Sequence, residues 1–249
     1  VFVTAFRIID KRRFEPIGLI VNKKWFNTLI IGVLIGFFII TINYTILYIL
    51  GYISIDELFY SDGTFNFFVE LAGRALGFFA VAVSEELFVR GYLLINIAET
   101  LKIKNISYNT SIIISLTLTS ILFGILHYFN ANATIISSLN LMFIGFLFGY
   151  AFVASGSLAL PIGIHFAWNF TQAQIFGLNV SGFPPLVSIF RSSLSGNTNI
   201  TGGNFGPEGG IIIIISVFVG LFLVNLFSDG QNSKKLSKFV SINTSIAQY

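Results

Sequence analysis

Several ionisable side chains of this chain stand in stretches that are otherwise apolar. Glu85 and Glu86 are adjacent and are followed by Arg90, His127 ends one apolar run, and His165 lies within another. These two are the only histidines of the 249 residues. Because a charged group inside a bilayer costs about 2.5–3.5 kcal/mol on insertion scales, such groups need a partner or a function.

The spacing of these residues predicts which of them can interact. Glu86 and Arg90 are four positions apart, so on a helix they share a face and can form an ion pair. Glu85 is rotated by about 100° from Glu86, faces a different neighbour and is suited to proton transfer. His165 and Asn169 also share a face. The simpler interpretation of each pattern is structural: glutamates that brace the fold through Arg90, and imidazole or amide groups that join helices.

The composition restricts the class of protein. The chain is 55% hydrophobic and only 10% charged, with a mean hydropathy of +0.85, which excludes a soluble globular domain and a disordered chain. The absence of cysteine excludes disulfides and thiolate-bound zinc. Lys and Arg flank apolar runs instead of forming a stripe, so the net charge of +3 indicates contact with a lipid bilayer and not with nucleic acid.

Six regions are long and apolar enough to cross a bilayer as helices. They are residues 28–50, 65–98, 110–129, 133–154, 157–176 and 210–227. The second contains five charged residues and would be about 51 Å long as one helix, so it must tilt, bend or project into water. Gly91 within it marks either a break or a close approach between two helices. The predicted fold class is all-α, a polytopic transmembrane helical bundle with about six spans.

The distribution of basic residues predicts the topology. Six alternating spans place eleven of the 14 Lys and Arg residues on one side, so both termini are expected in the cytoplasm. The predicted parts are a cytoplasmic juxtamembrane segment at 1–27, the membrane domain at 28–227 and a cytoplasmic tail at 228–249. The connections 51–64 and 177–209 then lie on the outer side, and the second either folds over the helices or forms a flexible loop. The start at Val1 leaves a further span upstream open.

Three short motifs together resemble a known family. They are Glu85-Glu86-x-x-x-Arg90 followed by Gly91, Phe123-x-x-x-His127, and His165-x-x-x-Asn169, in this order on separate apolar segments. This set resembles the motifs of the CPBP family of intramembrane proteases (CaaX protease and bacteriocin-processing, or Abi), and residues 176–182 and 201–208 look like its bacterial members. The resemblance covers roughly residues 66–210.

The resemblance implies a role for each polar residue. Glu85, together with His127, would activate a water molecule for attack on a peptide carbonyl. His165 and Asn169 would stabilise the oxyanion that forms. The expected activity is that of an intramembrane endopeptidase acting on a membrane-associated peptide or protein.

The same resemblance implies that Glu86 and Arg90 hold the geometry of the site. A rival mechanism makes Glu85, His127 and His165 ligands of a divalent metal such as zinc, because two histidines and a carboxylate form a common catalytic zinc set. The chain has no His-Glu-x-x-His motif, so such a metalloprotease would be of another type.

Two other classes of function fit the same residues. A non-catalytic membrane scaffold, or a bacteriocin self-immunity protein, would keep the polar cluster for stability, whereas an ion-coupled transporter would use Glu and His as a proton relay. We found no inverted repeat typical of transporters. The leading hypothesis is a CPBP-type protease in a bacterial cytoplasmic membrane.

Overall fold

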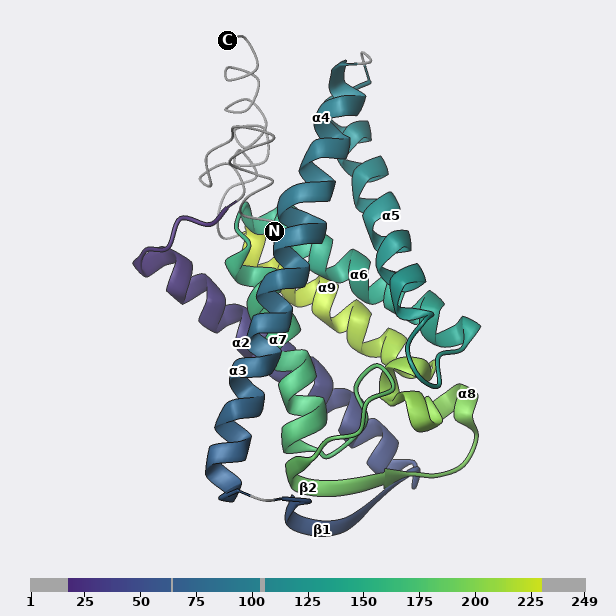
Figure 1. Cartoon of the computed structure of the whole chain (residues 1–249). Helices are drawn as coiled ribbons and strands as arrows, with labels where there is room; N and C mark the ends of the chain where they lie inside the picture. The colour runs from purple at the N-terminus through teal and green to yellow at the C-terminus, as the bar shows by residue number, and fades with distance from the viewer. Residues whose placement is uncertain (1–17, 64, 104–105, 230–249) are drawn as a thin grey trace.

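The computed structural model describes residues 18–63, 65–103 and 106–229, so most of the predicted segments 1–27 and 228–249 lie outside the described residues. Each of the six predicted spans is helical (Figure 1). The helices are α2 (Lys23–Ile49), α3 (Phe67–Glu86), the π-helix η3 (Leu87–Leu94), α4 (Ile95–Ile103), α5 (Tyr108–His127), α6 (Ile135–Ser155), α7 (Ala159–Phe170), the π-helix η4 (Thr171–Ile175) and α9 (Ile213–Asp229).

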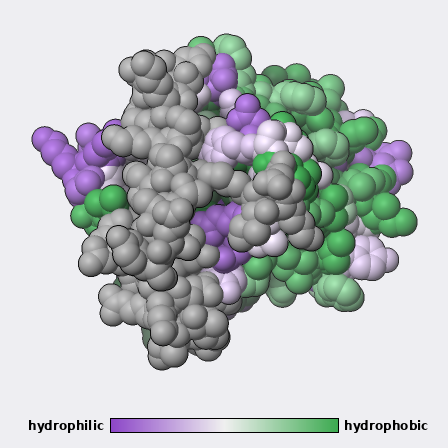
Figure 2. Space-filling view, turned by 90° about the horizontal axis from the view of Figure 1, so that it is seen from above, coloured by the Kyte–Doolittle hydropathy of each residue, from purple (hydrophilic) through white to green (hydrophobic). Residues whose placement is uncertain are grey.

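Four of these helical segments are long and apolar enough to cross a membrane. They are Lys23–Ile49, Phe67–Leu101, Tyr108–His127 and Ile135–Ser155. α9 is apolar but shorter, and α7 with η4 is also short. Many large apolar side chains are exposed, for example Leu76 and Phe129, and Figure 2 shows apolar residues over much of the described surface. The structure therefore has the transmembrane helices that the composition predicted, and four spans satisfy both length and hydropathy.

The second predicted span does not break at Gly91. α3, η3 and α4 follow one another without interruption, and Gly91 is buried within η3. The wider π-helical turn keeps the helix continuous, and such turns are frequent at functional sites. Figure 1 shows this long helix running from one end of the molecule to the other.

A two-stranded antiparallel sheet accompanies the mostly helical bundle that the sequence predicted. β1 (Ile53–Ser61) pairs with β2 (Val187–Leu194), with Ile53 opposite Leu194 and Ser61 opposite Val187. The sheet joins the two connections, 51–64 and 177–209, that the charge distribution placed on the same side of the membrane. The assignment of this side as the outer one stays a prediction. Connection 177–209 is folded, since it also contains α8 (Thr198–Thr201) and the short 3-10 helices η5 (Gly203–Phe205) and η6 (Pro207–Gly209).

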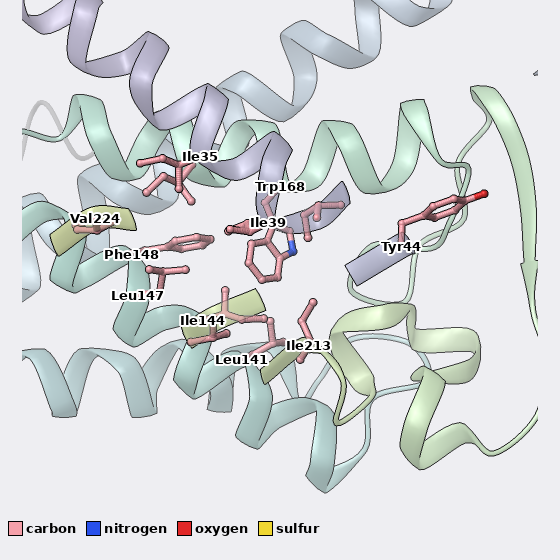
Figure 3. Packing of buried hydrophobic residues seen from close by; sticks show 14 of the residues in the cluster. Ile35, Ile39, Tyr44, Leu141, Ile144, Leu147, Phe148, Trp168, Ile213 and Val224 are labelled. Atoms are coloured by element: carbon pink, nitrogen blue, oxygen red, sulfur yellow. The ribbon is translucent and has the colours of Figure 1, made fainter. Parts of the chain in front are cut away.

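The core of the bundle lies between α2, α6, α7 and α9. Ile39 of α2, Phe148 of α6 and Trp168 of α7 are fully buried in one apolar cluster (Figure 3). α2 and α7 approach each other closely, because a Cβ on Gly32 would lie 2.4 Å from the carbonyl oxygen of Leu160. This contact fixes α7, which carries two of the predicted site residues.

Candidate active site

The end of α3 and the start of η3 position the first motif. Glu86 and Arg90 are both completely buried, and the Arg90 Nη1 donates a hydrogen bond of 2.9 Å to the Glu86 Oε1. Nη2 of Arg90 donates to the carbonyl oxygen of Gly145 in α6 at 2.9 Å. The guanidinium also lies over the rings of Phe123 and Phe148, at 4.8 and 5.6 Å from their centroids. The predicted ion pair is confirmed, and it ties the α3–η3 helix to α6.

The Glu86 carboxylate also holds His165, a contact that the sequence did not predict. The Nδ1 of His165 lies 2.9 Å from the Glu86 Oε1. Since the carboxylate oxygen is an acceptor, Nδ1 carries the proton, and this leaves Nε2 directed elsewhere. The imidazole stacks on Phe148 with centroids 4.8 Å apart. Glu86 thus sets both the tautomer and the orientation of His165.

Glu85 stands in a different environment from its neighbour. Its side chain is 34% exposed, whereas that of Glu86 is 0% exposed. The Glu85 Oε2 lies 3.9 Å from the His165 Nε2, and no hydrogen bond engages this oxygen among the described residues. The spacing predicted a different neighbour for Glu85 than for Glu86, but both carboxylates lie beside His165, Glu86 at Nδ1 and Glu85 at Nε2.

One cavity of about 830 Å³ is lined by all four predicted catalytic residues, Glu85, His127, His165 and Asn169. The Nδ1 of His127 donates to the carbonyl oxygen of Phe123 at 2.8 Å, which leaves its Nε2 for the cavity. Asn169 is 7% exposed, and no hydrogen bond to its amide occurs within the described part of the chain. Residues from α3, α5 and α7 therefore converge on a single space.

The segment that carries these motifs matches a known family. Residues 67–171 match the sequence model of the family described as "Type II CAAX prenyl endopeptidase Rce1-like". This segment is Rce1-like. The match covers less than half of the chain, but it includes Glu85, Arg90, His127, His165 and Asn169. It confirms the resemblance to the CPBP proteases. The searches of curated proteins and of solved structures found no match.

The cavity has one further carboxylate, Glu208 of η6, which lies outside the matched segment. It is 2% exposed. Its Oε1 accepts a hydrogen bond from the Trp168 Nε1 at 2.9 Å, and its Oε2 accepts from the backbone N–H and the hydroxyl of Ser181 at 2.8 and 3.0 Å. Burial raises the pKa of Glu208 despite these donors and the nearby His127.

Sequence reasoning did not identify Glu208 as part of the site. It is the only acidic residue in the glycine-rich connection 177–209, and it ends the stretch 201–208 that looks like bacterial members of the CPBP family, so two signals were available. The connection was assigned to the outer side without a chemical role. In the structure Glu208 attaches it to α7 through Trp168, and Ser181 places the neighbouring loop against the cavity.

The arrangement does not provide the ligand set of the metal hypothesis. No group of three or more His, Asp or Glu side chains is placed to hold a metal ion in the described ranges. His165 is hydrogen-bonded to Glu86 through Nδ1, and its Nε2 lies 3.9 Å from the Glu85 Oε2. We derive no step through a metal, and metal dependence stays a prediction for experiment.

Proposed function

We propose that this protein is an intramembrane CAAX-type endopeptidase. The observation that carries the proposal is the single cavity on which Glu85, His127, His165 and Asn169 converge, all four drawn from three helices of the segment that matches the family. Burial of so many polar groups in an apolar bundle is costly, and hydrolysis of a peptide bond gives each of them a task.

Glu85 is the proposed general base. Its carboxylate is partly exposed to the cavity and its Oε2 has no hydrogen-bond partner within the described residues, so it can accept a proton from a water molecule. The water oxygen then bonds to the substrate carbonyl carbon, and the carbonyl oxygen becomes an oxyanion. When the C–N bond breaks, the proton held by Glu85 passes to the leaving amine.

His165 and Asn169 are the proposed oxyanion donors. Glu86 accepts from the His165 Nδ1 and so orients the ring with Nε2 toward Glu85 and the cavity, where a proton on Nε2 would be donated to the oxyanion. The Asn169 side-chain amide has no hydrogen-bond partner among the described residues and shares the helical face of His165. A preorganised donor of this kind is typically worth about 2.7–4 kcal/mol in the transition state.

His127 completes the proposed set as a proton relay. Because its Nδ1 donates to Phe123 O, its Nε2 is the acceptor that can exchange protons with water in the cavity. This role matches the partial exposure of His127, in contrast to the burial of His165.

The proposed substrate is a membrane-associated peptide with a C-terminal C-a-a-X sequence and a prenylated cysteine. The cavity wall fits such a chain because most of it is apolar, with Phe78, Val81 and Phe88 from the long helix and Phe183 and Leu186 from the outer connection. A lipidated cysteine also holds the peptide at the bilayer, where the cavity lies.

The decisive experiment compares wild type with Glu85→Gln in detergent. Both are given prenylated and unprenylated C-a-a-X peptides, and the products are identified by mass spectrometry. We expect Glu85→Gln to lower kcat at least about 100-fold, since general base catalysis contributes about 10²–10⁴. The matched control is Glu57→Gln, which removes a 55% exposed carboxylate of β1 outside the cavity.

The outcomes distinguish the hypotheses. Equal cleavage by wild type and Glu85→Gln contradicts the proposed base, and no cleavage of any peptide by wild type contradicts the peptidase. A chelator arm tests the metal alternative: loss of activity with recovery by zinc favours a metal, whereas unchanged activity favours water activation by Glu85 alone.

A further inference from the structure

One face of the long helix forms a wall of the cavity well beyond Glu85. The residues of this face that line the cavity follow a helical repeat: Arg74, Phe78, Val81, Glu85 and Phe88. Arg74 and Glu85 are eleven positions, or about three turns, apart, so they share a face with about 16 Å between their levels. The cavity therefore extends from the proposed catalytic carboxylate to a cation.

Arg74 has no ion-pair partner among the described residues. The nearest carboxylate along its helix is Glu70, one turn earlier, but Glu70 accepts hydrogen bonds from the Ser61 hydroxyl and the Phe65 backbone N–H instead. Arg74 is exposed and lies within the apolar segment Phe67–Leu101. An exposed guanidinium without an ion-pair partner among the described residues is free to bind an anionic ligand in the cavity.

Gln174 of η4 supplies a second polar group without a partner. It lines the same cavity, is 1% exposed, and its Oε1 is buried without a hydrogen bond in the described part of the chain. α3 begins beside the sheet and α7 runs toward it (Figure 1). Arg74 lies in the first half of α3 and Gln174 lies in η4, which follows α7, so both belong to the parts of these helices nearer the sheet. Residues 183–186, which precede β2, line the cavity there.

We propose that Arg74 and Gln174 form a subsite for the C-terminal carboxylate of the substrate peptide. This inference rests on the proposed peptidase function and specifies its substrate class. A guanidinium binds a carboxylate through paired N–H donors, and the Gln174 Oε1 can accept the last peptide N–H of the same chain. Both polar groups at this end of the cavity would then be satisfied by a free peptide C-terminus.

The separation of the two groups limits where the peptide is cut. About 16 Å corresponds to roughly five residues of extended chain at about 3.3 Å each, and fewer once the arginine side chain extends toward Glu85. A peptide anchored at Arg74 therefore presents a bond within roughly five residues of its C-terminus to Glu85. The apolar side chains between them, such as Phe78 and Val81, favour apolar residues in this tail.

The test uses one peptide sequence in two forms, with a free C-terminal acid and with a C-terminal amide. Wild type is expected to cleave the acid with a kcat/KM about 10- to 100-fold higher, the usual effect of a hydrogen bond to a charged group. In Arg74→Gln the preference for the acid over the amide is expected to be lost, mainly because KM for the acid rises. The matched control is Arg191→Gln, because Arg191 is an exposed arginine that pairs with Glu57 outside the cavity; it should retain the preference.

Binding of the same peptides to Glu85→Gln separates this inference from the proposed catalysis. Measured by fluorescence anisotropy, the acid should bind about 10- to 100-fold more tightly than the amide, and adding Arg74→Gln should remove the difference. If acid and amide are cleaved and bound equally, the subsite is refuted while the peptidase stands. If Glu85→Gln binds the acid more tightly than the amide but wild type cleaves no peptide, the carboxylate subsite stands and the peptidase is refuted.

Discussion

α2 and α3 carry the same short pattern and use it differently. Each has two glycines four positions apart, Gly32 and Gly36 on α2 and Gly73 and Gly77 on α3. A Cβ on either α2 glycine would lie 2.4 Å from a carbonyl oxygen of α7, whereas a Cβ on either α3 glycine would meet nothing within 4 Å. Correspondingly, 39% of the 18-residue apolar stretch of α2 is buried, against 6% of the corresponding stretch of the helix that begins with α3.

The difference separates a packed region from an open one. α2 holds α7 at backbone distance and thereby fixes His165 and Asn169. α3 keeps most of its surface free and brings Glu85 to the cavity; its second half packs on α7, where Ala82 is buried and Phe79 contacts Phe166, and beyond it Arg90 of η3 is buried. We infer that the oxyanion donors are rigid while the helix with the base leaves room for a substrate.

The largest expected effect tests this attachment. Arg90→Met leaves the buried Glu86 carboxylate without its cation, which typically costs about 3–5 kcal/mol, so a large fall in the thermal unfolding temperature in detergent is expected. Arg74→Met on the open part of the same helix should change stability by less than about 0.5 kcal/mol. Similar losses in both variants would contradict the division of the helix into an attached and an open part.

The two glycine pairs provide the next test. Gly36→Ala places a methyl group 2.4 Å from the carbonyl oxygen of Ile164 and should destabilise the protein by about 1–3 kcal/mol, because the obstacle is backbone. Gly77→Ala meets no atom and removes a poor helix former, so it should be neutral or stabilising by up to about 1 kcal/mol. Chemical or thermal unfolding of both variants measures the contrast, and a destabilised Gly77→Ala would indicate that α3 is covered by a partner.

The sequence predicted the local features of this comparison and missed the non-local ones. Hydropathy placed all six helices, and a spacing of four predicted the Glu86–Arg90 pair, because both depend on one helix only. The bond from His165 to Glu86 depends on how α3 and α7 pack, and helical rise could not supply this. The identical glycine pairs show the same limit, since only the neighbouring helix decides whether a glycine is needed.

The sheet and Glu208 were missed for a related reason. β1 and β2 come from connections more than a hundred residues apart, so neither strand shows its partner in its own sequence. Glu208 lies in a connection that resembles a loop by its glycines, and its role follows only from contacts with Trp168 and Ser181, which lie 40 and 27 positions earlier in the chain. Local patterns therefore identify helices and motifs, whereas the packing of connection 177–209 against the cavity depends on tertiary contacts.

The smallest expected effect is the pH dependence of the contact by which Glu208 holds connection 177–209 against the cavity. Burial raises the pKa of Glu208 above its ordinary value of 4.5, so between 4.5 and the raised value the folded state binds more protons than the unfolded state. The contribution of Glu208 to the free energy of unfolding is fully present below pH 4.5 and is lost as the pH rises through its pKa in the folded state. Glu208→Gln cannot titrate, so the stability of wild type relative to this variant should decrease over that window.

The measurement is thermal unfolding of both proteins across the pH range, with Ser181→Ala as the matched control. Ser181→Ala removes one hydroxyl donor to Glu208 and should cost about 0.5–1.5 kcal/mol while the carboxyl group still titrates. His127 is the titratable group whose charge acts on Glu208, and it is present in all three proteins, so the difference isolates Glu208. A difference between wild type and Glu208→Gln that stays constant with pH would show that Glu208 keeps an ordinary pKa, and its burial would then have to be balanced by the Trp168 and Ser181 donors alone.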